Sequence, residues 1–354
     1  MVDLSTKIGS LRFQNPITVA SGTFGVKDEF KHFVNYRKLG AVIAKTITLR
    51  PRPGNPMPRI YETPAGMLNA IGLQNKGLQE FVENKIPHFR KHRIPLIVNI
   101  AGETTGEFVA LAKELNRHRK SITALELNLS CPNIEKGGVR AIREEKLISK
   151  TIRAVRKATQ LFLFAKLSPE LGDVVETAHE AVNAGADGLS LINTIRGMAI
   201  NIYSRQPTLW AGTGGLSGPA IRPIALRYVY EVKKALPRIP VIASGGITTW
   251  EDAVEFLIAG ADLLAVGTAN FINPRATLDI LEGIQSYCRK QKIKSINELR
   301  GSLELYRASV IARQHSRQGR SNLSLRIASS PLRGSSQPPS SKFFYRIGVA
   351  PAGQ

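Results

Sequence analysis

The chain is poor in cysteine, and it has no long apolar segment. Only two of its 354 residues are cysteines, Cys131 and Cys288, which argues against a disulfide framework and predicts a reducing, cytoplasmic location. Two thiolates also cannot supply the four ligands of an ordinary iron–sulfur cluster. No apolar run is long enough to cross a bilayer, and the N-terminus lacks the basic and then apolar pattern of a secretory signal.

Acidic residues are scarce relative to basic ones. The chain has 27 Asp and Glu residues against 49 Lys and Arg residues, for a net charge of +22. Eight of these positive charges fall in residues 306–354, which contain no acidic residue, and this leaves +14 for residues 1–305. No aromatic residues alternate with the basic ones, as a surface that stacks nucleic-acid bases would require. A solvated basic surface is therefore favoured, which could steer an anionic substrate or attract an acidic partner.

Eight short apolar runs recur along the chain, and segments with apolar residues at helical spacing separate them. Two of these helical segments are followed by Gly-Ala-Asp, and glycine is favourable just past the end of a helix. Near-continuous apolar strands that alternate with helices predict an α/β fold, a (β/α)8 TIM barrel in preference to an open sheet. The expected strands are residues 17–22, 41–46, 95–100, 124–130, 161–167, 188–194, 241–246 and 263–268.

Three connections exceed the usual length, and all of them leave the C-terminal ends of expected strands. They are residues 47–78, 132–146 and 195–222, and loops at this face of a barrel are candidates for a lid or a partner surface. We expect residues 1–305 to form one (β/α)8 barrel domain. Residues 306–354 are basic and rich in Ser, Arg and Pro without a period, and we expect this tail to be disordered.

Polar side chains end the expected strands, and in a barrel those ends meet at one face. Lysines end the second and fifth strands, and Cys131 with Pro132 follows the fourth, where proline stops the sheet ladder. A lone strand-end lysine is more often a surface residue, and a lone cysteine is more often a small buried apolar one. Their convergence favours a catalytic site instead, together with the asparagines that lie at the ends of the third, fourth and sixth strands, Asn99, Asn128 and Asn193.

Glycine-containing turns follow the last two strands, at residues 244–248 and 266–269. Glycines there let backbone N–H groups approach a phosphate, and the position after strands seven and eight is a frequent phosphate site in barrels. A glycine pair alone also serves any tight turn. The two turns together predict a phosphate-bearing cofactor or substrate, and the sequence predicts no metal site.

Several segments resemble the dihydroorotate dehydrogenase family. The resemblance covers residues 3–305 and is to class 1, in which the base is cysteine; residues 51–75 and 215–221 resemble class 1B, the NAD-linked catalytic subunit. Asn201 stands where this class suggests an acidic residue, and residues 205–213 diverge. The segments that carry the resemblance are Asn128–Asn133, Asn69–Asn75, Asn193–Thr194, Gly214–Gly218 and Ala243–Ile247.

The resemblance implies oxidation of (S)-dihydroorotate to orotate in pyrimidine biosynthesis. Hydride would pass from C6 to N5 of FMN while Cys131 takes the C5 proton, with Lys45 and Lys166 as the other catalytic residues. The implied substrate-binding residues are Lys45, Asn69, Ala70, Ile71, Gly72, Leu73, Asn128, Asn193 and Thr194. The implied cofactor-binding residues are Ser21, Lys45, Thr46, Asn99, Asn128, Lys166, Ile192, Gly218, Gly245, Gly246, Gly267 and Thr268.

The resemblance also implies a partner, since electrons must leave FMN and this chain cannot bind an iron–sulfur cluster. We expect an electron-transfer subunit with FAD and a [2Fe-2S] cluster in a heterotetramer built on a homodimer of this chain, and no membrane or nucleic-acid partner. One alternative is a dihydropyrimidine dehydrogenase subunit that acts on uracil or thymine. Another is a non-redox phosphate-binding barrel or nucleic-acid-binding module.

Overall fold

The computed structural model describes residues 2–25, 29–129, 140–170 and 172–306. The chain divides into two units, Met1–Leu303 and Glu304–Gln354. All the helices and strands given below belong to the first unit. Most of the tail, and Cys131 with its neighbours, lie outside the described residues.

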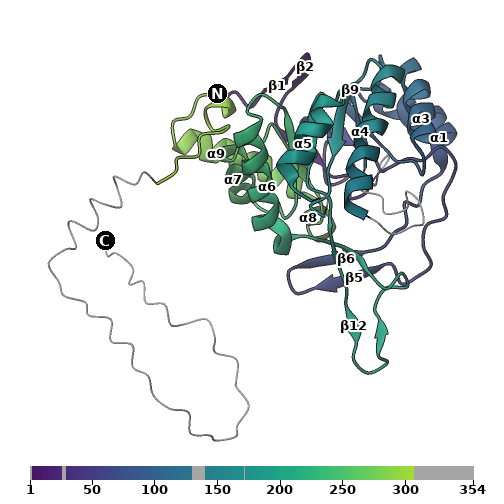
Figure 1. Cartoon of the computed structure of the whole chain (residues 1–354). Coiled ribbons are helices and arrows are strands. Elements are labelled where there is room, and N and C mark those ends of the chain that lie inside the picture. Colours follow the sequence, from purple (N-terminus) through teal and green to yellow (C-terminus); the bar gives the residue numbers. More distant parts are fainter. Residues whose placement is uncertain (1, 26–28, 130–139, 171, 307–354) are drawn as a thin grey trace, which may run out of the picture. The chain divides into compact units, whose positions relative to one another are not determined.

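Eight parallel strands form one sheet in the order β3-β16-β15-β10-β9-β8-β7-β4 (Figure 1). The two end strands also meet, because the backbone N–H of Gly40 donates to the carbonyl of Ile17 over 2.8 Å. The sheet is therefore the predicted TIM barrel. Its strands are β3 (Ile17–Val19), β4 (Val42–Ile43), β7 (Leu96–Ile100), β8 (Ala124–Asn128), β9 (Phe162–Lys166), β10 (Gly188–Leu191), β15 (Val241–Ser244) and β16 (Leu263–Val266).

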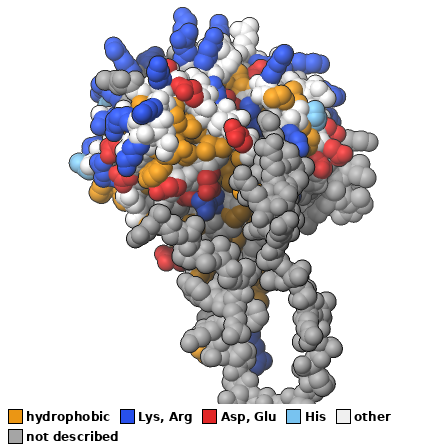
Figure 2. Space-filling view, turned by 90° about the vertical axis from the view of Figure 1, so that its left-hand side faces the viewer, with side chains coloured by type: hydrophobic (Ala, Val, Ile, Leu, Met, Phe, Trp, Pro, Cys, Tyr) orange, Lys and Arg blue, Asp and Glu red, His pale blue; other side chains and the backbone are white. Residues whose placement is uncertain are grey.

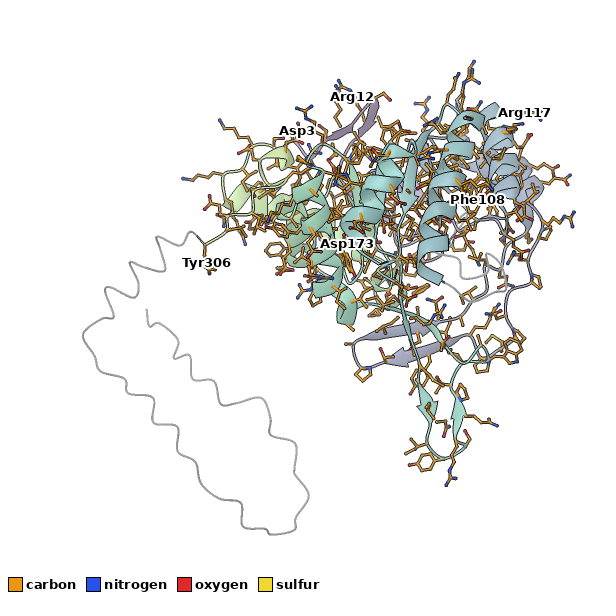
Figure 3. The ribbon with its side chains drawn as sticks, in the orientation of Figure 1. Asp3, Arg12, Phe108, Arg117, Asp173 and Tyr306 are labelled. Atoms are coloured by element: carbon orange, nitrogen blue, oxygen red, sulfur yellow. The ribbon has the colours of Figure 1, made fainter. Side chains whose placement is uncertain are left out.

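Helices follow the strands and cover the outside of the barrel (Figure 1). Side chains cap the N-termini of some of them: Asp173 accepts from two backbone N–H groups of α5, and Thr104 accepts from the backbone N–H of Glu107 in α3. In Figure 3, α3 runs upward from Phe108 to Arg117, its last residue. The helices are α1 (Gly77–Glu80), α2 (Ile86–Lys91), α3 (Thr105–Arg117), α4 (Arg140–Ala158), α5 (Val174–Asn183), α6 (Arg222–Ala235), α7 (Trp250–Ile258), α8 (Ala269–Ile272) and α9 (Ala276–Lys290).

Alternate residues of each strand face opposite sides, and this produces two cores. On β8, Ala124 belongs to the cluster inside the barrel, whereas Leu125 and Leu127 pack against the helices. The antiparallel pair β1 (Thr6–Ile8) and β2 (Leu11–Phe13) adds Ile8 and Phe13 to the inner cluster. The N-terminal half of the barrel interior is therefore filled with apolar side chains, which leaves the other end for polar ones.

A second sheet lies beyond the C-terminal ends of the barrel strands, below the barrel in Figure 1. Its four antiparallel strands have the order β11-β14-β6-β5 and come from two of the three connections that were expected to be loops. The third expected loop, residues 132–146, ends earlier than predicted because α4 begins at Arg140. The additional strands are β5 (Ile60–Thr63), β6 (Gly66–Asn69), β11 (Ile195–Gly197) and β14 (Gly214–Ser217), with a separate hairpin of β12 (Ile200–Asn201) and β13 (Gln206–Pro207).

Basic side chains are distributed over the molecular surface. On the face shown in Figure 2 they gather mostly along the upper edge, and acidic and apolar side chains alternate with them below. The basic runs at residues 90–93 and 117–120 end helices, and their Lys and Arg residues are exposed to solvent. This distribution agrees with a solvated basic surface. Among the described residues, no helix is both long enough and apolar enough to span a bilayer.

Candidate active site

A cavity of about 1080 Å³ lies at the C-terminal ends of the barrel strands, where the second sheet covers them. Every predicted site residue that the structure describes lines this cavity, although their individual roles stay predictions. Cys131 lies outside the described residues, but Asn128, the last residue of β8, lines the cavity. The predicted residues brought together are Ser21, Lys45, Thr46, Asn69, Ala70, Ile71, Gly72, Leu73, Asn99, Asn128, Lys166, Ile192, Asn193, Thr194, Gly218, Gly245, Gly246, Gly267 and Thr268.

The strand ends supply these residues because the polar end of each apolar run lies at the C-terminal face of the barrel. The predicted strand at 188–194, for example, ends at Leu191, and the next three residues, Ile192 to Thr194, turn into the cavity wall. The hydroxyl of Ser244 holds this turn by donating to the carbonyl of Ile192 over 2.8 Å. This strand therefore ends earlier than the apolar pattern predicts, and the residues just beyond it line the cavity.

The two predicted lysines occupy different surroundings. Lys166 is 9% exposed, and its ammonium lies 3.9 Å from a carboxylate oxygen of Glu126. For Lys45, by contrast, the described residues provide no hydrogen bond or ion pair, and burial and then the nearby Arg59 guanidinium hold its pKa below the ordinary value of 10.5. The cavity thus holds one ammonium with a fixed counter-ion and one without such a partner in the described part of the chain.

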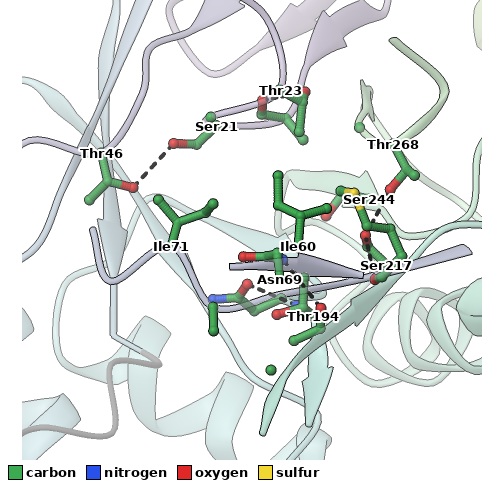
Figure 4. A pocket seen from close by; sticks show the side chains of 18 of the residues that line it. Ser21, Thr23, Thr46, Ile60, Asn69, Ile71, Thr194, Ser217, Ser244 and Thr268 are labelled. Carbon is green, nitrogen blue, oxygen red and sulfur yellow. Dashed lines mark hydrogen bonds between the residues drawn. The ribbon is translucent and has the colours of Figure 1, made fainter. Parts of the chain in front are cut away.

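Amide and hydroxyl groups face each other across the cavity (Figure 4). The amide of Asn193 donates to the side-chain oxygen of Asn128 over 3.1 Å, and the amide of Asn69 donates to the carbonyl of Gly215 over 3.2 Å. Figure 4 also shows two pairs of hydroxyls on other walls, Ser21 with Thr46 at 3.2 Å and Thr268 with Ser217 at 2.8 Å. Side chains that both donate and accept suit a polar heterocyclic ring.

The turn after β15 has a backbone that requires glycine. Gly245 and Gly246 have φ of +123° and +78°, and a Cβ on Gly246 would lie 2.6 Å from the Cβ of Arg222 in α6. Asp252 of α7 secures the residues that follow, because its carboxylate accepts from the backbone N–H groups of Thr248 and Thr249 over 2.8 and 2.9 Å. The turn is therefore held close to α6, with its backbone exposed on the cavity side.

Some cavity residues were not among the predicted site residues. Arg52, Arg59 and Arg196 line the cavity from the connections after β4 and β10, and they add positive charge to it. Glu126 lies beneath the cavity, where its carboxylate accepts from the amide of Asn99 and from the hydroxyl of Ser190, the latter over 2.5 Å. A charged residue within an apolar strand was visible in the sequence, but its partners come from other strands. Among the described residues, no group of His, Cys, Asp and Glu is arranged to hold a metal ion.

Comparison with known proteins identifies the family. A family model described as dihydroorotate dehydrogenase matches residues 3–288. A protein of Thermoanaerobacter sp. (strain X514) called "Dihydroorotate dehydrogenase B (NAD(+)), catalytic subunit" is 47% identical over 305 residues, which are 86% of this chain and all of that protein. Proteins of the same name from Alkaliphilus metalliredigens and Bacteroides thetaiotaomicron are 48% identical over 302 residues and 47% identical over 305 residues, covering 85% and 86% of this chain and 99% and 100% of theirs. Because the matched segment contains the whole barrel and its cavity, the chain belongs to the dihydroorotate dehydrogenase family.

Proposed function

We propose that this chain is the FMN-binding catalytic subunit of an NAD-linked dihydroorotate dehydrogenase, which oxidises (S)-dihydroorotate to orotate in pyrimidine biosynthesis. The family match and the names of the relatives support the activity. The observation that carries the proposal is the convergence of strand-end lysines and amides on one cavity of about 1080 Å³. A barrel that only bound phosphate would not need two lysines and several amides at the same strand ends.

The residues of the cavity fit FMN in size and in chemistry. Ligand cavities in proteins commonly measure about 300–1,000 Å³, so this one has room for a mononucleotide and a small second molecule. The buried side-chain oxygen of Asn99 has no hydrogen-bond partner among the described residues, and it could accept an N–H of a flavin ring. The Gly245–Gly246 turn and the Ser217–Thr268 hydroxyl pair offer donors for a phosphate.

Bound in this cavity, FMN would supply the acceptor of the substrate's hydride. We assign to Lys166 a fixed positive charge at the cavity floor, where it stabilises the negative charge that a ring acquires on reduction. We assign to Lys45 the contact with the anionic substrate, and to Asn69, Asn128 and Asn193 the hydrogen bonds that orient the pyrimidine ring. Cys131, which follows β8, is the proposed base for the C5 proton.

The relatives are called catalytic subunits, and this name implies a separate electron-transfer partner. We propose that the partner carries FAD and a [2Fe-2S] cluster and joins a homodimer of this chain in a heterotetramer. The proposal predicts that the purified chain alone reduces NAD far more slowly than the reconstituted pair. A cytoplasmic location, as the low cysteine content predicts, belongs to the same proposal.

The experiment that tests the activity follows the colour of the bound flavin. The purified chain should be yellow, and dihydroorotate added without oxygen should bleach it, whereas dihydrouracil should not. Bleaching by dihydrouracil would favour the dihydropyrimidine dehydrogenase alternative. A colourless protein that cannot be loaded with FMN would overturn the proposal.

A pair of cysteine variants tests the proposed base. Cys131→Ala should keep its yellow colour but bleach roughly 10²–10⁴-fold more slowly, the usual contribution of a positioned acid or base. Cys288→Ala is the matched control, because Cys288 is buried in α9 and does not line the cavity. It should bleach at the rate of the unchanged protein. Equal rates in both variants would remove Cys131 from the mechanism.

A further inference from the structure

Glu126 is a buried carboxylate to which neither the family resemblance nor the proposed function assigns a role. It lies in the middle of β8 with 1% of its surface exposed. Because side chains two residues apart on a strand share a face, Glu126 points into the barrel directly below Asn128, which lines the cavity. Glu126 itself does not line the cavity. It is therefore placed to act on the cavity floor from beneath.

Groups from three neighbouring strands surround the Glu126 carboxylate. Asn99 of β7 donates its amide to one carboxylate oxygen, and Ser190 of β10 donates its hydroxyl to the other over 2.5 Å. The ammonium of Lys166, from β9, lies 3.9 Å from the first oxygen, a separation too long for a hydrogen bond but within the range of an ion pair. Two of the three partners, Asn99 and Lys166, also line the cavity.

The charges in this cluster show which partner stabilises the negative charge of Glu126. Asn99 and Ser190 are neutral donors, and the amide oxygen of a glutamine could accept from Asn99 while its amide group donates to the Ser190 hydroxyl. Hydrogen bonding therefore does not require the negative charge of Glu126. An uncompensated charge in a barrel interior is costly, so the ionised carboxylate is stable there because a cation lies beside it. Within the cluster that cation is Lys166.

We propose that Glu126 is the positioning residue for Lys166: its carboxylate pairs with the ammonium and holds it at the cavity floor. The position of Lys166 toward the cofactor rests on the proposed function, but the ion pair itself does not. Asn99 is oriented by the same carboxylate, because a carboxylate only accepts and the Asn99 amide nitrogen must face it. The Asn99 oxygen is then directed away from Glu126 and left for a ligand.

The ion pair with Glu126 gives Lys166 a counter-ion that Lys45 does not have among the described residues. Lys166 has a counter-ion fixed on the neighbouring strand, so its charge is largely balanced before any ligand binds. For Lys45 the described residues provide no such partner, and the nearby Arg59 repels it. An anionic substrate therefore gains more from Lys45 than from Lys166. Lys166 is left to face the ring of the cofactor, as the proposed function requires.

The test measures how fast a small amine-reactive reagent, acetic anhydride, labels each lysine of the flavin-free full chain at one mildly alkaline pH. Labelling of Lys166 and Lys45 is read separately by peptide mass spectrometry. An amine that is held against a carboxylate reacts slowly, and Glu126→Gln removes the charge that holds the amine of Lys166. In Glu126→Gln, labelling of Lys166 should rise at least about tenfold, since breaking a buried ion pair releases the amine that the carboxylate held in place. Lys45 should change less than about twofold.

Ser190→Ala is the matched control, because it removes one hydrogen bond from Glu126 but leaves the charge. Its labelling of both lysines should stay within about twofold of the unchanged chain. An unchanged rate at Lys166 in Glu126→Gln would overturn the proposal. A parallel rise at Lys166 and Lys45 would also overturn it, because that pattern indicates a loosened barrel instead of a lost ion pair.

A second variant covers the case in which Glu126→Gln does not fold. Glu126→Asp keeps the charge but shortens the side chain by one methylene, so the carboxylate withdraws from the ammonium. Labelling of Lys166 should then rise by more than in Ser190→Ala, and no rise above that control would overturn the pairing. These measurements involve no flavin, so a chain that failed to bind FMN would lose its proposed function while the ion pair could still be established.

Discussion

The substitution Gly246→Ala isolates the contribution of the turn after β15. Gly246 has φ of +78°, and a non-glycine residue in this left-handed region costs about 1–2 kcal/mol. The added Cβ would also lie 2.6 Å from the Cβ and 2.9 Å from the Cα of Arg222, and overlap of this kind costs about 1–3 kcal/mol. Together these effects predict a loss of about 2–5 kcal/mol in the free energy of unfolding.

The predicted loss is large enough to measure by thermal unfolding. At about 2 °C per kcal/mol for a barrel of this size, Tm of the flavin-free chain should fall by about 4–10 °C. The turn must also shift away from α6, so one charge-assisted hydrogen bond to a phosphate would be lost. FMN should then bind about tenfold more weakly or worse, as determined by fluorescence titration.

Gly267→Ala provides the contrast. Gly267 lines the same cavity, but it has no positive φ, and the nearest atom to an added Cβ is the Cβ of Ala20 at 3.5 Å, an ordinary contact. Tm should therefore change by about 1 °C or less. If Gly246→Ala left Tm unchanged, or if Gly267→Ala lowered it equally, the steric reasoning would be wrong.

Three further predictions concern charge and chain length. Orotate binding, measured by calorimetry, should weaken as pH rises through the lowered pKa of Lys45, which lies below 10.5, and Lys45→Arg should move this loss to higher pH. Burial would raise the pKa of Asp252, but hydrogen bonds from Thr248 and Thr249 and the Arg222 charge lower it overall below 3.8. The stabilisation of the fold by ionised Asp252 is therefore fully present above the pKa of the unfolded chain, and it is lost as pH falls through the lower pKa of the folded chain. Asp252→Asn should accordingly cost about 1–3 kcal/mol of unfolding free energy at pH 7 in denaturant unfolding, and progressively less in acid. A chain ending at Leu305 should keep FMN and the rate of flavin reduction, and a tenfold loss would give the tail a function.

The barrel was predictable because its signals are local. Each buried strand is a short apolar run, and a cap such as Asp173 begins the next helix, so the alternation of strand and helix is readable without knowledge of contacts. The second sheet was not predictable in the same way. Its strands are short, and β14 begins with Gly214–Gly215, which has the composition of a loop. These strands form because β6 and β14, which are far apart in sequence, pair with each other where the second sheet covers the cavity.

The topology of the barrel explains why the predicted site residues lie close together. In a barrel of parallel strands, the residue after each strand faces the same cavity, so knowing where strands end identifies the lining. The sequence could not predict how those side chains pair. Glu126 and its partners Asn99, Lys166 and Ser190 come from four strands, and only the lateral order of β7, β8, β9 and β10 brings them together.

The same lateral order explains why the two lysines differ although each ends a strand. Lys166 ends β9, which is paired along its length with β8, so a carboxylate two residues below the end of β8 is within reach of its ammonium. Lys45 follows β4, which pairs with β7, and the side chain of Asn99 that β7 places toward the cavity floor is neutral. The inward-facing residue near the end of the neighbouring strand thus decides whether the lysine meets a counter-ion inside the barrel or stays available to an incoming anion. The double variant Asn99→Asp with Glu126→Gln should therefore move the fixed negative charge from β8 to β7, the strand that pairs with β4. A carboxylate there would balance the charge of Lys45, so orotate should bind more weakly.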